Sequence, residues 1–527
     1  MLGLLLVLAG ELAWAVRSDG LAYDELTLVA SGYWHLTTGD AGFNPEHPPL
    51  AKLLGALPLL ALRPAVPETQ PGENHWSFGH RFFHVANDAD RLVPLARIPS
   101  VLLTLALAVL LWRWSRAAHG VSAGIGALAL AAFQPSLLAH GHVATTDLPA
   151  TFLMVAASWL FWRWSLAPGL GRGLIVAAIF VLAAAARHTT WVLIPGFALL
   201  LALGRANAPR PSLRKTAILA LTFLVAFPLV LGAVYAFDLG PARGIPALPA
   251  AVEWLLALLP RNYVGGAMGF FSLAALEQPY PVYLLGRISE DGWRAYHVVA
   301  LAAKSTPGFL LALVAGAAAL IRRRPSRGDV ETHWLVPAVL VLLSASLSRV
   351  QTGERYALGM HPYLILLAAR AVPWALSSTG GRVLLAVTAL LHIGPSLDAA
   401  RGGYLPYFNV FAGGTHGGHR ILTDSNLDWG QDLPRLADWM RRRGVDRIQL
   451  GYFGKDDPRR FGIRHKDLPG SHGCAAGLPR HPFTGVVVVS PNLVLSHRPQ
   501  GDPYAALRGR PPDERAGVFF VYRFPPP

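Results

Sequence analysis

The sequence predicts an all-α polytopic membrane protein that ends in a small α/β domain, and three observations lead to this fold class. First, 53% of the 527 residues are hydrophobic and only 15% are charged, against roughly a quarter charged in a typical soluble domain. Second, the apolar residues form long runs, and the mean hydropathy is +0.39. Third, residues 397–527 change to short β-rich segments between Pro and Gly turns. This composition excludes an ordinary soluble enzyme.

About eleven apolar runs are candidate membrane spans, because a transmembrane helix needs about 20 mostly apolar residues. They are residues 1–16, 93–112, 121–139, 148–163, 173–186, 190–204, 216–236, 298–321, 333–348, 357–373 and 383–396. The first run is short and contains Glu11, and its residues 13–15 (Ala-Trp-Ala) resemble a signal-peptidase site. A first span and a signal peptide both fit it, and either one places the following residues outside the cytoplasm.

Lys and Arg in the short loops set the orientation, because cationic loops are retained on the cytoplasmic side. Alternate loops are basic and almost free of acids. Their basic residues are Arg113, Arg116, Arg163, Arg172, Arg205, Arg210, Arg214, Lys215, Arg322, Arg323, Arg324, Arg327 and Arg382. The formal charge of +15 is therefore a topology signal rather than a sign of nucleic-acid binding.

This topology gives a membrane domain, residues 1–396, and three long segments outside the cytoplasm. The long segments are 17–91, 237–296 and 397–527. The last of these combines strand-like runs with one amphipathic helix, which predicts the small α/β domain. The strand-like runs are 450–453, 485–489 and 518–522, and the helix lies near 430–443. Its single cysteine, Cys474, excludes an intramolecular disulfide.

The first long segment carries the earliest candidate site residues. Asp24 and Glu25 follow the first span directly. Two acids at a membrane surface are costly, which indicates a functional role for them. Asp24 also fits a helix N-cap. Farther along, Lys52 fits either a lysine that extends to the lipid headgroups or a phosphate ligand.

Further charged residues lie at the predicted outer ends of the spans. They are Arg187, Arg355 and Lys304, and a charged residue placed there is a functional-site hypothesis by default. Anchoring at the membrane surface fits Arg187 and Lys304 equally well, and pairing with Glu354 fits Arg355.

Acidic and histidine residues lie near the same predicted surface. Asp147, which precedes Pro149, fits a helix N-cap or a group that shapes the site. His140 and His142 with Asp147 have only a weak metal-binding spacing, so we expect no obligatory metal, while the same groups leave room for a divalent cation. In the tail, Asp428 fits contact with an acceptor or capping of the helix that follows.

Six motifs, taken in order, resemble glycosyltransferase family 39. They are Asp24-Glu25, residues 46–52 (EHPPLAK), residues 140–147 (HGHVATTD), residues 304–307 (KSTP), residues 353–356 (GERY) and residues 424–432 (DSNLDWGQD). This family depends on dolichyl- or polyprenyl-phosphate sugars and includes protein O-mannosyltransferases and the aminoarabinose transferases of lipid A. The resemblance covers nearly the whole chain.

The resemblance implies a GT-C fold with its active site between the first external loop and the outer face of the membrane. Asp24 matches the catalytic acid and Glu25 its neighbour. The resemblance also implies inversion of a sugar delivered as a β-linked lipid phosphate. Besides the four candidate phosphate ligands Lys52, Arg187, Arg355 and Lys304, the predicted site-shaping residues are Glu46, His47, His142, Asp147, Tyr356 and Asp428.

The predicted function is therefore transfer of one sugar from a polyprenyl-monophosphate carrier to an acceptor hydroxyl outside the cytoplasm. The acceptor is a glycolipid, a glycan or a protein, and the composition favours a bacterial inner membrane. A secondary transporter and a non-catalytic envelope-glycan assembly protein are the alternatives. A transporter places ionisable residues near the bilayer midplane, whereas here the unusual charges cluster at the outer ends of the spans.

Overall fold

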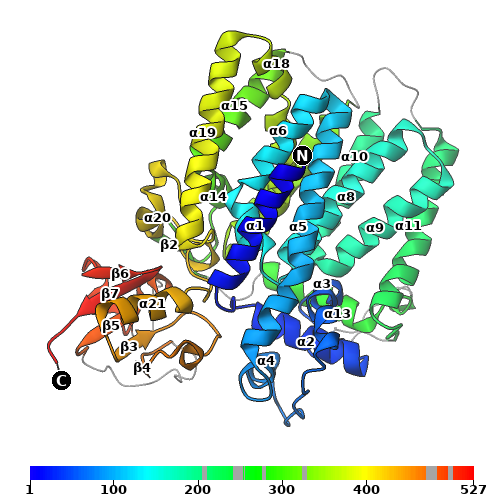
Figure 1. Cartoon of the computed structure of the whole chain (residues 1–527). Coiled ribbons are helices and arrows are strands. Elements are labelled where there is room, and N and C mark those ends of the chain that lie inside the picture. Colours follow the sequence, from blue (N-terminus) through cyan, green and yellow to red (C-terminus); the bar gives the residue numbers. More distant parts are fainter. Residues whose placement is uncertain are drawn as a thin grey trace.

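The structure, a computed structural model, describes residues 1–204, 211–240, 253–254, 256–275, 281–322, 329–470, 483–495 and 502–526. It consists of a helical bundle with a sheet-containing tail at one end (Figure 1). Cys474, the basic loop residues Arg205, Arg210, Arg323, Arg324 and Arg327, and parts of the predicted segment 237–296 lie outside the described residues.

The predicted apolar runs all fall on helical segments of the bundle. These are α1 (Leu2–Ser18), α5 (Ala89–His119), α6 (Val121–Ala132), α7 (Pro135–Gly141), α8 (Asp147–Leu166), α9 (Leu170–Ala186), η2 (His188–Val192), α10 (Leu193–Leu203), α11 (Leu213–Val234), α14 (Tyr296–Lys304), α15 (Pro307–Arg322), α16 (Thr332–Leu347), η3 (Glu354–Met360), α17 (His361–Ala369), α18 (Val372–Leu376) and α19 (Thr379–Gly402). Their apolar side chains pack into one large core.

Among the described residues, three helices are long and apolar enough to cross a membrane, namely α5, α11 and α19. Up to two more spans arise if each bent pair counts as one: α6 with α7, bent by 61°, and α14 with α15, bent by 115°. The fold is that of a multi-pass membrane protein, but the predicted count of about eleven spans is not confirmed. One reason is Pro307, because proline lacks the N–H that a continuous helix from 298 to 321 needs.

The first long loop forms short helices that lie across the tail side of the bundle (Figure 1). They are α2 (Glu25–Thr38), α3 (Pro49–Ala56), η1 (Leu57–Ala61) and α4 (His75–His84). Helix α2 ends at Gly39, whose φ of +76° favours glycine. Helix α3 packs closely on α2, since a Cβ at Gly32 would lie 2.1 Å from the carbonyl oxygen of Lys52. The loop is therefore a compact layer rather than an extended connection.

The second long loop is described in part. It contains α13 (Arg261–Ala275) and a hairpin of β1 (Val282–Leu284) and β2 (Arg287–Ser289), which pair antiparallel. Helix α13 lies near the first loop, since a Cβ at Gly266 would approach the carbonyl oxygen of Pro45 to 2.1 Å.

The tail carries a five-stranded mixed sheet in the order β4-β3-β5-β7-β6. The strands are β3 (Ile448–Gly451), β4 (His465–Asp467), β5 (Val486–Val489), β6 (Glu514–Ala516) and β7 (Phe519–Arg523). Strand β3 pairs parallel with β4 and β5, whereas β7 pairs antiparallel with β5 and β6. The apolar side of α21 (Leu433–Arg443) packs on this sheet through Leu433, Leu436 and Met440. A small α/β unit is thus present, as the strand-like runs predicted.

Three backbone contacts join the tail to the start of the first long loop. Gly20 N–H donates to the Gln431 carbonyl at 2.8 Å, and Tyr23 N–H donates to the Trp429 carbonyl at 2.7 Å. Leu21 N–H donates to the Asp456 carboxylate at 2.9 Å. The residues directly before Asp24 are therefore held by the tail.

Candidate functional site

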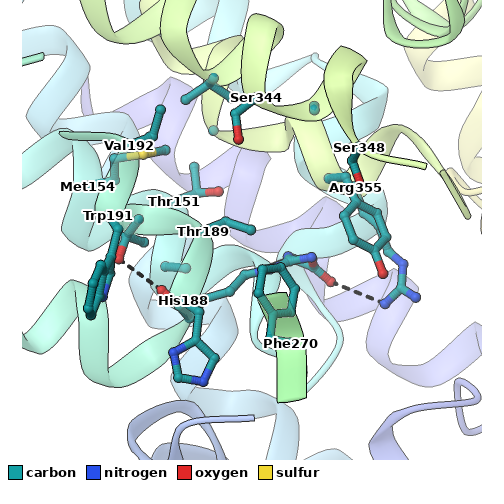
Figure 2. A pocket seen from close by; sticks show the side chains of 18 of the residues that line it. Thr151, Met154, His188, Thr189, Trp191, Val192, Phe270, Ser344, Ser348 and Arg355 are labelled. Carbon is teal, nitrogen blue, oxygen red and sulfur yellow. Dashed lines mark hydrogen bonds and ion pairs between the residues drawn. The ribbon is translucent and has the colours of Figure 1, made fainter. Parts of the chain in front are cut away.

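Two adjacent chambers lie where α8, η2, α16 and η3 meet the long loops. The first chamber has a volume of about 480 Å³ and combines three charged residues with an apolar wall that includes Met154, Val341 and Leu347. The second chamber, of about 350 Å³, lies against residues 45–48 of the first long loop and against α13. Arg187, His188, Phe270, Ser348 and Tyr356 line both chambers. Figure 2 shows the first chamber, with His188, Phe270 and Arg355 among the residues that line it.

Asp24 and Arg355, distant in the sequence, form an ion pair beside the first chamber. Arg355 Nη1 donates to Asp24 Oδ2 at 2.6 Å. Asp24 precedes α2, but its side chain accepts no capping hydrogen bond. The capping interpretation of Asp24 is therefore wrong, and its carboxylate belongs to the cation cluster instead.

Asp147 joins the same cluster from the first turn of α8. Its Oδ1 pairs with Arg187 Nη1, and its Oδ2 lies 3.9 Å from Arg355 Nη1. The capping interpretation is wrong here too, because no side chain caps α8. Arg187 follows α9 in an extended conformation, with φ −162° and ψ 135°. Two of the predicted cations, Arg187 and Arg355, thus meet between two carboxylates.

Aromatic rings hold the two guanidinium groups. The Cζ atoms of Arg187 and Arg355 lie 4.9 and 5.4 Å from the centre of the Tyr356 ring. Arg355 Cζ also lies 4.4 Å from the centre of the Trp429 ring, which the tail contributes. Cation–π contacts of this kind orient a guanidinium without neutralising it.

Glu25 is placed differently from Asp24. It is 1% exposed, and both of its oxygens are occupied. They accept hydrogen bonds from Arg97 Nε and Nη2 and from the backbone N–H groups of Ala22 and Ala144, at 2.7–2.9 Å. Burial raises the pKa of this carboxyl, but Arg97 and the two amides outweigh it and hold the pKa below its usual value. Glu25 therefore fixes the loop and does not face either chamber, contrary to the predicted catalytic position.

Lys52 does not line either chamber. It is 3% exposed, and its Nζ donates to the Asn44 carbonyl at 2.6 Å. Burial lowers the pKa of Lys52 to about 7. The interpretation as a lysine extending to the headgroups is wrong, and the ammonium instead closes the turn that carries Glu46 and His47.

Lys304 is also buried away from the chambers. Its Nζ donates to the carbonyls of Leu405 and Asn426 at 2.7 and 2.6 Å and lies 3.9 Å from Glu354 Oε1. These contacts join α14 to the tail. Neither predicted role, a phosphate ligand or a surface anchor, agrees with this position. Glu354 pairs with Lys304 and not with Arg355, so the alternative proposed for Arg355 is wrong.

Glu46, His47 and His142 have separate positions. Glu46 and His47 line the second chamber. Burial and the neighbouring cations, Lys52 first, lower the pKa of His47 to about 3, so its imidazole is neutral at physiological pH. His142 lies elsewhere, with Nδ1 2.7 Å from the Leu138 carbonyl and Nε2 3.0 Å from Asp19 Oδ2. Its role is to hold Asp19 and not to shape the chambers.

Asp428 lies inside the tail. It accepts hydrogen bonds from Ser490 Oγ at 2.5 Å and from Gly430 N–H at 2.9 Å, and it does not cap α21. Burial raises its pKa to about 7. Asp424, which the sequence did not single out, is nearer the cluster. Burial raises its pKa to about 6, Arg355 lowers it and Asp24 raises it.

Two residues of the site, Trp429 and His188, and one buried residue outside it, Arg97, were not assigned a role from the sequence. Trp429 lies in a quoted motif, but nothing local indicates that its ring covers Arg355. His188 follows Arg187 and lines both chambers. Arg97, the partner of Glu25, had a usable signal: it is a charged residue inside a predicted span, which marks a functional or structural pairing.

The described residues contain no group of three or more His, Cys, Asp and Glu side chains that could hold a metal ion. His140 is fully buried beside Trp429, with 5.9 Å between ring centres. His142 is bound to Asp19. The predicted grouping of His140, His142 and Asp147 therefore does not form within this part of the chain.

Comparison with protein-family models and with curated proteins gives no match. Among solved structures, the archaeal oligosaccharyltransferase AglB from Archaeoglobus fulgidus, in complex with an inhibitory peptide and a dolichol-phosphate, matches 83% of this chain. The TM-score is 0.50 and the identity 12%. An Archaeoglobus fulgidus oligosaccharyltransferase tethered with an acceptor peptide matches 92% of this chain, with a TM-score of 0.50 and 12% identity. This chain covers 58% and 61% of those two chains.

ArnT from Cupriavidus metallidurans, bound to undecaprenyl phosphate, is a further neighbour. Its TM-score is 0.45 at 13% identity, with 99% of this chain and 97% of that chain covered.

The fold is therefore that of a GT-C membrane protein, as the resemblance in the sequence implied. At 12% identity it is the fold that this chain shares with the oligosaccharyltransferase. In this chain the fold brings together the pair of Asp24 with Arg355 and the pair of Asp147 with Arg187 beside a partly apolar chamber.

Proposed function

We propose that this chain is an integral membrane glycosyltransferase that moves one sugar from a polyprenyl-monophosphate carrier to an acceptor hydroxyl. One observation carries the proposal: a carboxylate, Asp24, touches a two-arginine cluster that lines a chamber with an apolar wall. A polyprenyl-phosphate sugar needs these elements together: an apolar wall for the chain, cations for the phosphate and a base beside the anomeric carbon. The GT-C fold supports the same class of reaction.

Asp24 is suited to the role of general base. Its Oδ2 is bound by Arg355, while Oδ1 accepts no hydrogen bond from the residues that the structure describes. An acceptor hydroxyl that donates to Oδ1 is aligned to attack C1 of the sugar. As the new C–O bond forms, the bond from C1 to the phosphate oxygen breaks, and the hydroxyl proton passes to Asp24. Direct displacement inverts the anomeric centre, so a β-linked donor gives an α-linked product.

Arg187 and Arg355 are suited to stabilise the leaving phosphate. Both line the first chamber, and their carboxylate partners hold them in place before the carrier binds. Fixed cations in a site that excludes water stabilise developing negative charge more strongly than mobile ones. A strong general acid is not needed, because phosphate is itself a good leaving group.

Three of the predicted site residues, Glu25, Lys52 and Lys304, have supporting roles in this proposal. Glu25 and Lys52 fix the loop that carries Asp24, Glu46 and His47. Lys304 joins the tail to the bundle.

We place the site outside the cytoplasm of a bacterial inner membrane, where the acidic loops face away from the basic ones. The acceptor is a hydroxyl of a glycolipid, a glycan or a protein.

The test is turnover of synthetic polyprenyl-phosphate sugars by purified protein in lipid nanodiscs, measured as released polyprenyl phosphate. Asp24→Asn keeps the shape of the side chain but cannot take the proton, so turnover should fall by about a hundredfold or more. Asp40→Asn is the matched control, since Asp40 is an exposed acid of the same loop. It should retain wild-type turnover.

Two results would overturn the proposal. One is an Asp24→Asn variant as active as the wild type. The other is a folded wild-type protein that releases no lipid phosphate from any donor, which would favour the transporter or the assembly protein instead.

A further inference from the structure

The second chamber contains a buried side chain with unused hydrogen-bonding capacity. His188 is 2% exposed, and within the described part of the chain neither of its ring nitrogens has a hydrogen-bond partner. A neutral imidazole has one N–H donor and one acceptor nitrogen. Leaving both unpaired in a buried position costs free energy, so this arrangement indicates a polar ligand.

The His188 ring is held in one orientation. It lies against Tyr263, with ring centres 5.0 Å apart, and Tyr263 is itself fixed by the Trp191 indole N–H at 2.6 Å. On another side, a Cβ at Gly266 would lie 3.5 Å from His188 Nε2. A fixed ring of this kind selects among ligands, because it cannot turn to follow a misplaced partner.

The chemistry of the second chamber suits a small neutral polyol. His47 offers a second neutral imidazole, and Glu46 a carboxylate. The aromatic rings of Phe270 and Tyr356 offer apolar faces. Glycines of α13 also line the chamber, and a Cβ at Gly269 would meet nothing within 4 Å. Hydroxyl partners beside aromatic faces and an open wall match a saccharide ring.

The relation between the two chambers indicates that this saccharide is the sugar of the donor. This step rests on the proposed transfer. Arg187 lines both chambers and is the cation at their shared wall. A phosphate held there has its prenyl chain along the apolar residues of the first chamber. The other substituent of the same phosphate then lies in the second chamber, and that substituent is the sugar to be transferred.

We propose that the second chamber holds the sugar ring of the donor and that His188 hydrogen-bonds one of its hydroxyl groups, which makes His188 a residue that determines sugar specificity. Its contribution is made to the sugar and not to the phosphate or the prenyl chain. Replacing it should therefore change how strongly the protein distinguishes a sugar-bearing carrier from the bare one.

The test is equilibrium binding without an acceptor, in nanodiscs. The probes are a synthetic polyprenyl phosphate and its glucose, mannose and arabinose esters. In the wild type at least one ester should bind more tightly than the bare phosphate. His188→Phe should lower the affinity for that ester by about tenfold, while the affinity for the bare phosphate stays the same. His188→Asn, which keeps a donor and an acceptor, should recover part of the gain.

A second variant keeps the test valid if His188→Phe does not fold. Gly269→Leu adds a bulky side chain at a residue that lines the second chamber and should reduce the gain for every ester without affecting the bare phosphate. The matched control is His416→Phe on an exposed segment of the tail, which should bind all probes as the wild type does.

Three results would overturn this inference. In the first, no ester binds more tightly than the bare phosphate in the wild type. In the second, the His188 and Gly269 variants weaken binding of the ester and the bare phosphate equally. In the third, both variants leave donor binding unchanged and raise the KM for the acceptor, which would assign the chamber to the acceptor. Failure of the proposed transfer is distinguishable, because it appears as absent turnover whatever the binding data show.

Discussion

The adjacent acids Asp24 and Glu25 belong to two different polar regions. These regions differ in how completely their hydrogen-bonding and charged groups are paired. In the anchor cluster (Asp19, Glu25, Arg97, His142 and Arg435), carboxylates and cations saturate one another. Arg97 alone donates to Glu25 and to the carbonyls of Val16, Asp19 and Gly20. In the cavity cluster (Asp24, Asp147, Arg187, Arg355 and Tyr356), Arg355 Nε is buried without a hydrogen-bond partner among the described residues.

The difference shows how neighbouring acids acquire different roles. Glu25 has four donors and no remaining capacity, so it stabilises one backbone conformation. Asp24 has one side-chain partner in the described part of the chain, Arg355, which lines the first chamber, so it can respond to a ligand bound there. Saturated buried networks specify structure, whereas incompletely paired ones are typical of binding sites. Substitutions in the anchor cluster should therefore reduce stability, and those in the cavity cluster should reduce activity.

The largest effect is expected for Arg97→Met in the anchor cluster. Removal of this guanidinium leaves Glu25 buried without a counter-charge, which typically costs about 3–5 kcal/mol of stability. Thermal unfolding in detergent should show a large drop in midpoint or a failure to accumulate folded protein. Arg91→Met is the matched control, because Arg91 is an exposed residue of the same helix. An unchanged midpoint for Arg97→Met would remove the distinction between the two regions.

The next effect is expected for Arg355→Gln in the cavity cluster. Loss of a fixed cation at the leaving phosphate should lower turnover by about a hundredfold, or about 2.7 kcal/mol of transition-state stabilisation. The unfolding midpoint should stay near the wild-type value, because the side chain is partly exposed to the chamber. Arg382→Gln, an exposed arginine elsewhere, is the control for turnover. A large loss of stability with Arg355→Gln would place this residue in the anchor class instead.

The outcome for individual residues shows how far the sequence could predict this site. Helix positions followed from apolar runs, because that signal is local, and the tail strands followed from β-rich segments. The pairing of Asp24 with Arg355 spans 331 positions and depends on tertiary packing. Lys52 and Lys304 resembled Arg187 in the sequence, yet nearby carbonyl groups bind them away from the chambers. The type of cation and its position in the sequence could not reveal which carbonyl groups lie close to it in the folded protein.

A third effect concerns Asp428, whose carboxylate is hydrogen-bonded by Ser490 and Gly430 but, in the described part of the chain, by no cation. Its pKa rises from 3.8 to about 7 in the folded state. The folded state thus holds the proton more tightly, so this contribution to stability is full below pH 4 and is lost as pH rises through about 7. Between pH 5 and 7 the loss should be about 2 kcal/mol.

Asp428→Asn cannot titrate, so the fall in its unfolding midpoint from pH 5 to pH 7 should be smaller than in the wild type. Asp438→Asn, an exposed acid of α21, is the control and should keep the wild-type pH dependence. Identical profiles for Asp428→Asn and the wild type would mean that burial does not raise this pKa. The tail would then resemble the anchor cluster, in which charges are compensated.

The smallest effect is expected for Trp429→Leu, which tests whether the tail contributes to the cavity cluster or only packs on it. The indole ring lies 4.4 Å from Arg355 Cζ, and such a contact contributes about 0.5–2 kcal/mol. Because leucine keeps an apolar side chain but has no π face, turnover should fall about two- to thirtyfold with little change in unfolding midpoint. Trp254→Leu, at an exposed indole, is the control. Wild-type turnover in Trp429→Leu would show that Asp24 and Asp147 alone orient Arg355. A fall in midpoint without loss of turnover would instead assign the ring to packing between the tail and the bundle.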